Sequence, residues 1–201
     1  MAGNGAWITT FTGRRFYVLA PRVEDVAIED IAHALSMQCR FTGHVKSFYS
    51  VAQHSVLVSR LCPPEDALWG LLHDASEAYI GDMNAPLKHT SEMSHFRAVE
   101  GDILDIVVKR FGLTLNEPKT VRHADRRMLL TEARDLGLDV TGWYKGYDPL
   151  PGKIFPWNPP RAEREFLERF AELTGARVMA SADFRSQADG FHDYEVAHGI
   201  S

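Results

Sequence analysis

Apolar residues recur along most of this chain with the period of an amphipathic helix. Between residues 28 and 35 they follow the spacing i, i+3, i+4, i+7, which predicts a helix with one buried face. Ser50 is suited to cap a second helix, and Pro63-Pro64 ends it and starts the next. The pattern then predicts a helix from Glu65 that reaches its end near Gly81.

Three further helices are predicted in the second half of the chain. Apolar positions recur over residues 96–111, 121–136 and 161–173. The residues between the last two segments, 137–160, are rich in Gly, Pro and Trp and read as a loop. The segment around Asn84-Ala85-Pro86 is also expected to be a loop.

The N-terminal pattern is different. Residues 7–11 and 15–19 are β-prone runs on either side of Thr12-Gly13-Arg14, which predicts a short hairpin. The expected fold is therefore all-α, a helical bundle with a short N-terminal β-hairpin. We expect one domain over residues 1–175 and a loosely ordered tail over 176–201, where the sequence is polar.

Composition narrows the class of protein. The chain has 201 residues, enough for a hydrophobic core without disulfides. Its formal charge of −5 argues against a general nucleic-acid or membrane-surface binder. No apolar run approaches the roughly 18 residues that span a bilayer. The two cysteines form no C-x-x-C pair and the N-terminus lacks a secretory pattern, so we expect a cytoplasmic protein.

Four residues with metal-binding side chains fall in the predicted helices. They are His54, the adjacent pair His73-Asp74, and Asp125. Two imidazole nitrogens and two carboxylates suit Zn, Co, Mn or Fe(II) better than an all-thiolate or all-oxygen site would. Neighbouring residues of a helix point about 100° apart, so His73 and Asp74 can share an ion only if other helices bring His54 and Asp125 to it.

Further polar residues follow the His-Asp pair. Glu77 lies four positions after His73, so it shares a helix surface with the pair and is placed to activate water or protonate a leaving group. Asp82 is suited to accept from a sugar hydroxyl, and Lys88 to hold a phosphate.

These motifs resemble those of HD-domain phosphohydrolases, whose signature is a His, a His-Asp pair and a distant Asp. The stretches Ala52–Ser55, His73–Glu77, Pro86–Lys88 and Ala124-Asp125 are similar to the HD-type nucleotidases acting on deoxynucleoside monophosphates. They also resemble the dATP triphosphohydrolases of phages that replace adenine with 2-aminoadenine. The likeness runs from about Phe11 to Leu173.

The resemblance implies a role for each matching residue. His54, His73, Asp74 and Asp125 match the family's metal ligands, and Glu77 matches its catalytic carboxylate. The implied substrate contacts are Arg40 with phosphate, Phe41 with the base opposite Pro86, Asp82 near the deoxyribose 3′ hydroxyl, and Lys88 with the phosphate chain. The implied cofactor is Co²⁺, Zn²⁺ or Mn²⁺, with Mg²⁺ accompanying a triphosphate.

Two features stand apart from this pattern. Gln53 occupies a position that is usually Glu in the nucleotidases, which puts in doubt a contact behind the metal ligands. The aromatic residues of the loop, Trp143, Tyr144, Tyr147 and Trp157, are placed to cover a pocket or to form a subunit contact.

The resulting expectation is a metal-dependent enzyme that cuts dATP to deoxyadenosine and triphosphate, depleting dATP in the host cytoplasm of a phage with 2-aminoadenine DNA. One alternative is a 5′-nucleotidase acting on deoxynucleoside monophosphates. Another is a non-catalytic binding module stabilised by metal. We expect a small-molecule deoxynucleotide as the partner, neither nucleic acid nor membrane, and a homo-oligomer, either a dimer or a hexamer.

Overall fold

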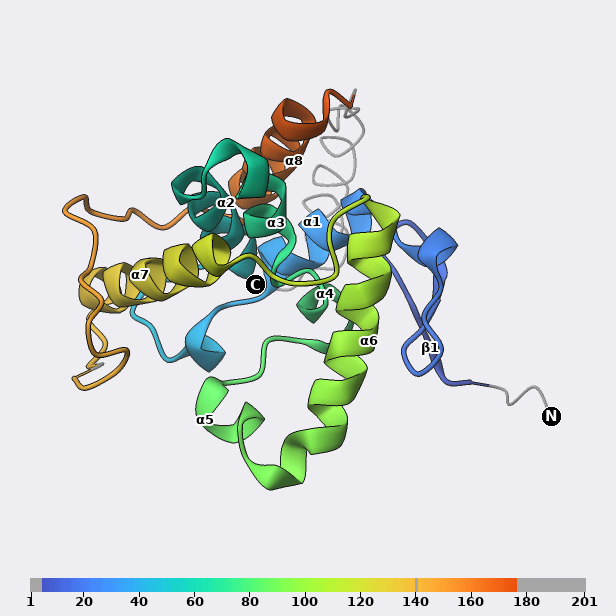
Figure 1. Ribbon diagram of the computed structural model, residues 1–201, viewed down its shortest axis with the longest axis horizontal. Coiled ribbons are helices and arrows are strands. Elements are labelled where there is room, and N and C mark those ends of the chain that lie inside the picture. Colours follow the sequence, from blue (N-terminus) through green and yellow to red (C-terminus); the bar gives the residue numbers. More distant parts are fainter. Residues whose placement is uncertain (1–4, 140, 177–201) are drawn as a thin grey trace, which may run out of the picture.

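The computed structural model describes residues 5–139 and 141–176 (Figure 1). Over these residues the protein is mostly helical with one short antiparallel sheet, in agreement with the sequence. The tail expected over residues 176–201 lies outside the described residues except for Ala176. No helix in the described ranges is both long and apolar enough to cross a membrane.

The chain passes through its helices and strands in the following order, with η marking short 3-10 helices: β1 (Trp7–Thr9), β2 (Arg15–Tyr17), η1 (Val23–Asp25), α1 (Ile28–Met37), η2 (Phe41–Gly43), α2 (Val51–Leu61), η3 (Pro64–Asp66), α3 (Ala67–Leu72), α4 (Glu77–Ile80), α5 (Ala85–Lys88), η4 (Ser91–Met93), α6 (Ser94–Arg110), α7 (Lys119–Leu136) and α8 (Pro159–Thr174).

The predicted hairpin is present. β1 pairs with β2 in the register Ile8 opposite Phe16, and Gly13 between them takes the left-handed backbone that a tight turn needs, at φ 81°. The side chain of Phe16 is fully buried and stacks on Tyr79 with ring centroids 3.8 Å apart. This contact anchors the hairpin to α4.

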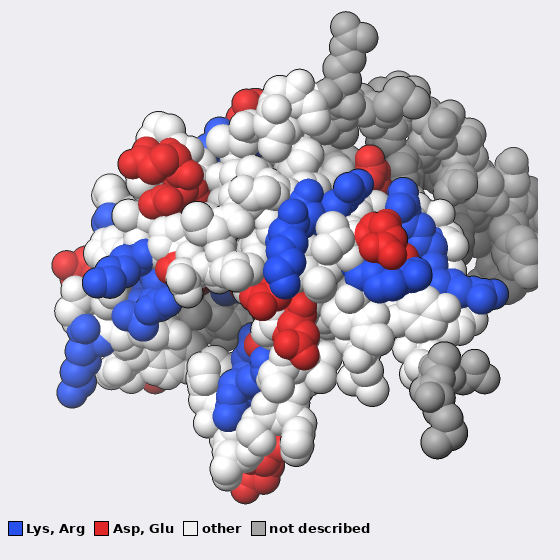
Figure 2. Space-filling model, turned by 45° about the vertical axis from the view of Figure 1, so that its right-hand side comes forward, with Lys and Arg blue, Asp and Glu red and all other residues white. Residues whose placement is uncertain are grey.

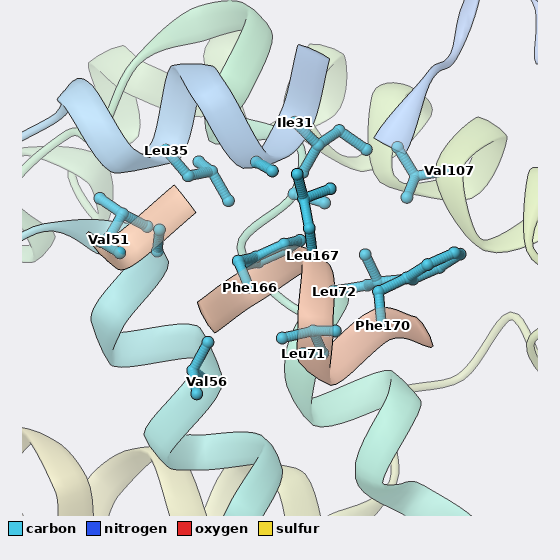
Figure 3. Close-up of a cluster of buried hydrophobic side chains, with 14 of the residues drawn as sticks. Ile31, Leu35, Val51, Val56, Leu71, Leu72, Val107, Phe166, Leu167 and Phe170 are labelled. Atoms are coloured by element: carbon cyan, nitrogen blue, oxygen red, sulfur yellow. The ribbon is translucent and has the colours of Figure 1, made fainter. Parts of the chain in front are cut away.

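The core lies where α8 crosses α1 and α2 (Figure 3). The apolar face of α8, carrying Phe166, Leu167 and Phe170, contacts the buried faces of the neighbouring helices. The structure confirms the capping of α2 by Ser50, whose hydroxyl accepts a hydrogen bond of 3.1 Å from the backbone N–H of Gln53. Apolar burial on α1, α2, α3 and α8 therefore fixes the framework that holds the polar site.

Two local predictions are wrong. The helix expected from Glu65 to Gly81 is interrupted: α3 ends at Leu72, residues 73–76 form turns, and α4 begins at Glu77. Backbone bonds between residues three apart, such as the 3.0 Å bond from Glu77 N–H to Asp74 C=O, replace the helical pattern there. The segment after Asn84, expected to be a loop, is the short helix α5, because the Asn84 side chain caps it.

Figure 1 shows how these elements surround the site. The segment from α3 to α4 occupies the middle of the molecule, α7 lies on one side of it, and α6 with α5 lies on the other. The loop after α7, drawn in orange, runs beyond the outer side of that helix. The His-Asp pair at residues 73 and 74 is therefore central, as the sequence requires.

Candidate metal centre

Four side chains from three separate segments converge at the centre of the helical framework. His54 comes from α2, His73 and Asp74 from the turn after α3, and Asp125 from α7. The ligand atoms of His54, His73 and Asp74 lie within 4.8 Å of one another, an arrangement able to hold a metal ion. Asp125 Oδ1 lies 3.2 Å from His54 Nε2 and 4.0 Å from His73 Nε2. All four predicted ligands are thus brought together.

The two imidazoles are oriented by contacts behind them. His73 Nδ1 is 2.8 Å from the carbonyl of Gly70, and His54 Nδ1 is 2.6 Å from Glu132 Oε1. Each Nδ1–H donates to an oxygen, so each Nε2 turns its lone pair toward the centre. The two Nε2 atoms lie only 3.2 Å apart. Two lone pairs at that distance repel, and a positive charge must offset them.

That charge is either a proton or a cation. Burial and Arg40 lower the pKa of His54, but the carboxylates of Glu132 and Asp125 outweigh them and raise it to about 9. Without metal, the proton therefore stays on His54 Nε2 and bonds to Asp125. A divalent cation would replace this proton, and the mixed nitrogen and oxygen donors fit a borderline transition metal such as Zn²⁺, Co²⁺ or Mn²⁺.

Glu132 is the residue of this centre that sequence reasoning missed. Its side chain is fully buried on α7, where Oε1 accepts from His54 Nδ1 and from the Tyr49 hydroxyl at 2.8 Å, and Oε2 accepts from Arg40 Nε at 3.2 Å. The sequence feature that could have pointed to Glu132 is its position seven residues after Asp125, which places it on the same face of α7 two turns later.

The side chain of Gln53 bonds to the segment 155–157 and not to the candidate metal ligands. Its amide nitrogen donates to the carbonyl of Phe155 at 2.9 Å, and its oxygen accepts from the backbone N–H of Trp157 at 2.7 Å. The sequence raised the possibility that Gln at this position weakens a contact behind the ligands. In the structure Glu132 supplies that contact, so Gln53 is free to hold the 155–157 segment.

A cavity of about 840 Å³ opens beside the candidate metal centre. Its walls include all of the remaining predicted site residues, which are Arg40, Phe41, Glu77, Asp82, Pro86 and Lys88. Phe41 has a left-handed backbone at φ 56°, a conformation that is rare for a bulky residue and is often found at binding sites. The cavity is of the size that holds small-molecule ligands.

Glu77 is buried at the wall of this cavity with one oxygen unpaired. Its Oε2 has no hydrogen-bond partner among the described residues, and its Oε1 lies 3.6 Å from Lys88 Nζ. Burial raises the pKa of Glu77 well above its ordinary range, and the nearby carboxylates of Asp74 and Asp82 raise it further. A carboxyl with a raised pKa in a cavity wall is suited to take up and release a proton.

The cavity's two predicted phosphate ligands already have carboxylate partners. Arg40 bonds to Glu132, and its Nη1 lies 3.4 Å from Asp74 Oδ2. Lys88 Nζ lies 2.6 Å from Glu100 Oε1 in addition to its contact with Glu77. Burial lowers the pKa of Lys88, but the bond to Glu100 outweighs this and raises it above the ordinary value, so the lysine stays charged.

Charge on the outer surface is mixed. Figure 2 shows basic and acidic side chains interspersed over the face it presents, without a broad field of one sign. A negatively charged ligand would therefore be bound by individual cationic side chains inside the cavity, since this face offers no extended basic surface.

Comparisons with known proteins place the chain in a family. YfdR of Escherichia coli K12, described only as an uncharacterized protein, is 40% identical over 179 residues, which cover 87% of this chain and 99% of YfdR. The Rhodobacter capsulatus protein RCAP_rcc00048, also described as uncharacterized, is 35% identical over 161 residues, or 75% of this chain and 82% of that protein. No protein-family model matches the sequence. The chain belongs to the same family as YfdR.

Proposed function

We propose that this protein is a metal-dependent phosphohydrolase of the HD type that acts on deoxynucleotides, with dATP cut to deoxyadenosine and triphosphate as the preferred reaction. The observation that carries the proposal is the convergence of His54, His73, Asp74 and Asp125 beside a cavity with a buried, proton-accepting Glu77. The order of these residues along the chain and their spatial arrangement both fit the HD pattern.

The four ligands would hold a divalent cation, which when bound supplies Lewis-acid activation of the phosphate and of water. Glu77 takes a proton from the attacking water and delivers it to the 5′ oxygen as the bond from phosphorus to that oxygen breaks. The water oxygen forms the new bond to the α-phosphorus, so atoms and charge balance. Arg40 lies beside Asp74 and is positioned to offset charge on that phosphate.

The remaining predicted contacts serve the nucleoside. Asp82 lines the cavity, and burial raises its pKa, which suits a carboxyl that hydrogen-bonds to a sugar hydroxyl. Phe41 and Pro86 line the same cavity, and the ring of Phe41 offers a flat face on which a base would stack. Base selectivity for adenine rests on the family resemblance alone.

One observation favours the 5′-nucleotidase alternative. The sequence points to triphosphate chiefly through Lys88, but Lys88 Nζ is held by Glu100 at 2.6 Å and faces Glu77 at 3.6 Å. A lysine that already has two carboxylate partners gains less from a phosphate chain than a free one. Removal of the single phosphate of a deoxynucleoside monophosphate would not need Lys88.

Product analysis decides between these reactions. The full chain is incubated with Co²⁺, Mn²⁺, Zn²⁺ or Mg²⁺ and a panel of deoxy- and ribonucleotide mono-, di- and triphosphates, and the products are separated by chromatography. Release of inorganic triphosphate from dATP supports the preferred reaction. Orthophosphate from dAMP with intact dATP supports the nucleotidase.

Two variants connect either activity to the site. Glu77→Gln keeps the shape of the side chain and is expected to lower kcat roughly 10²–10⁴-fold with metal content unchanged. Asp74→Ala is expected to lose both metal and activity. A metal-loaded wild type that leaves every nucleotide in the panel intact refutes the enzyme proposal in favour of a non-catalytic binding module.

A further inference from the structure

Arg126 is a cation of the cavity wall that the proposed reaction leaves unused. It directly follows the predicted ligand Asp125 on α7, and its half-buried side chain lines the same cavity. Within the described ranges no carboxylate lies within 4.0 Å of its guanidinium. By contrast, Arg40, Lys88 and Arg122 each have at least one carboxylate partner within that distance. An arginine with this exposure keeps most of its donors available to an anion.

Arg97, another cavity residue, has no such spare capacity. Its Nη1 donates to the backbone carbonyls of Lys88 and Thr90, and these bonds tie the start of α6 to the end of α5. No described carboxylate lies within 4.0 Å of Arg97 either, but its donors are used to hold the backbone in place. This leaves Arg126 as the better candidate for binding a ligand.

Two tyrosines hold the guanidinium of Arg126 in a fixed orientation. Its Cζ lies 5.4 Å from the ring centroids of both Tyr144 and Tyr147, and its Nη1 donates to the Tyr147 hydroxyl at 3.0 Å. The rings are arranged edge to face, 6.5 Å apart. A guanidinium held between aromatic rings loses less conformational freedom on binding an anion than a free one.

The backbone near Arg126 also points to a built site. Tyr144 has a left-handed conformation at φ 42°, an uncommon state for a bulky residue. This conformation brings the Tyr144 ring to the cavity, beside Trp143, which also lines it. Of the four aromatic residues expected to cover a pocket or form a subunit contact, Trp143 and Tyr144 thus line the cavity from the α7 side, whereas Tyr147 does not line it and Trp157 is buried in the hydrophobic core.

We propose that Arg126, held by Tyr144 and Tyr147, forms an anion subsite that binds the phosphates of a polyphosphate chain beyond the one attacked. The inference rests on the proposed phosphohydrolase function and assigns the chain a direction: from the metal centre toward α7 and the 143–147 loop, away from Lys88 on α5. It also gives a physical basis for preferring a triphosphate when Lys88 is already paired.

Binding of inorganic tripolyphosphate and orthophosphate to the full chain at fixed Mn²⁺ concentration tests this subsite by calorimetry. Arg126→Met removes the charge but keeps an apolar stem between the tyrosines. It is expected to weaken tripolyphosphate binding about 10- to 100-fold and orthophosphate binding by less than about threefold. Arg126→Lys, which keeps the charge without the planar fork, is expected to recover part of the loss.

Arg127→Met is the matched control. Arg127 is the next residue of α7, and its Nε donates to the carbonyl of Asp148 at 3.3 Å, so it anchors the same loop without lining the cavity. Its substitution is expected to leave both anions bound as in the wild type. Equal weakening of both anions by Arg126→Met shows a merely structural role for Arg126 and overturns the proposal, as does unchanged tripolyphosphate binding or its absence in the wild type.

A failure of the Arg126 subsite can be distinguished from a failure of the proposed phosphohydrolase function. Selective loss of tripolyphosphate binding in Arg126→Met, in a protein that hydrolyses no nucleotide, supports the subsite and refutes the enzyme proposal. Hydrolysis of dATP with the same KM in Arg126→Met and wild type supports the enzyme and refutes the subsite.

Discussion

Replacing Glu132 with Gln tests the electrostatic reasoning on which the metal centre depends. Both carboxylate oxygens accept hydrogen bonds from donors: Oε1 from His54 and Tyr49, and Oε2 from Arg40. A glutamine must place its NH₂ group at one of these positions, where a donor would face a donor. The substitution also removes the charge that pairs with Arg40, itself only 8% exposed.

The expected magnitude follows from this burial. Removing one partner of a buried ion pair costs about 3–5 kcal/mol, because the remaining charge stays in a medium that solvates it poorly. Loss of the hydrogen bond behind a metal-binding histidine lowers metal affinity roughly 10- to 100-fold. Glu132→Gln is therefore expected to lose about 3–5 kcal/mol of unfolding free energy without metal and to bind Mn²⁺ about 10- to 100-fold more weakly.

Urea unfolding in EDTA measures the first quantity, and calorimetric titration with Mn²⁺ measures the second. Glu168→Gln is a matched control, since Glu168 lies on α8 with a side chain that is 63% exposed and pairs with Arg164 at 3.8 Å. That change should cost less than about 1 kcal/mol. If Glu132→Gln binds Mn²⁺ within twofold of the wild type and unfolds like Glu168→Gln, the reasoning is refuted.

Three further predictions follow from the same structure. The pKa of His54 is about 9 without metal, above the ordinary 6.5, so the contribution of His54 to the unfolding free energy in EDTA is complete below pH 6.5 and is lost as pH rises through about 9. Urea unfolding at pH 6, 7.5 and 9 measures this loss. A His54→Gln variant whose unfolding free energy has the same pH dependence as the wild type contradicts the prediction. Gln53→Glu removes the hydrogen-bond donor to the Phe155 carbonyl and is expected to lower the unfolding free energy in urea by about 1–3 kcal/mol with Mn²⁺ affinity unchanged. A tenfold fall in Mn²⁺ affinity would show instead that Gln53 supports the metal ligands. Phe166→Ala, at a fully buried position between α8 and its neighbours, is expected to cost about 3–5 kcal/mol, and a loss below 1 kcal/mol by urea unfolding would show that the core lies elsewhere.

The helices and the ligand set could be predicted from the sequence because both depend on local patterns. Apolar spacing located α1, α6, α7 and α8 to within a few residues, and Ser50 marked the start of α2. His54, His73, Asp74 and Asp125 were singled out as candidate ligands by their donor atoms together with the resemblance to the HD motif, since the chain has nine histidines and 27 acidic residues in all. The break between α3 and α4 was not predictable. The apolar pattern continues across residues 73–76, and nothing in it signals the backbone turn bonds around Asp74 that interrupt the helix.

Only the tertiary structure decided which charges are neutralised and which remain free. Arg40 meets Glu132 across 92 positions of sequence, and Gln53 meets Trp157 across 104. No periodic pattern encodes such pairs, because they depend on how packed helices bring distant side chains together. The same packing pairs Lys88 with Glu100 and leaves Arg126 between two tyrosines. The sequence thus indicated which residues are candidate cation ligands, whereas the partners of each charged group, and hence its availability to a ligand, were set by the fold.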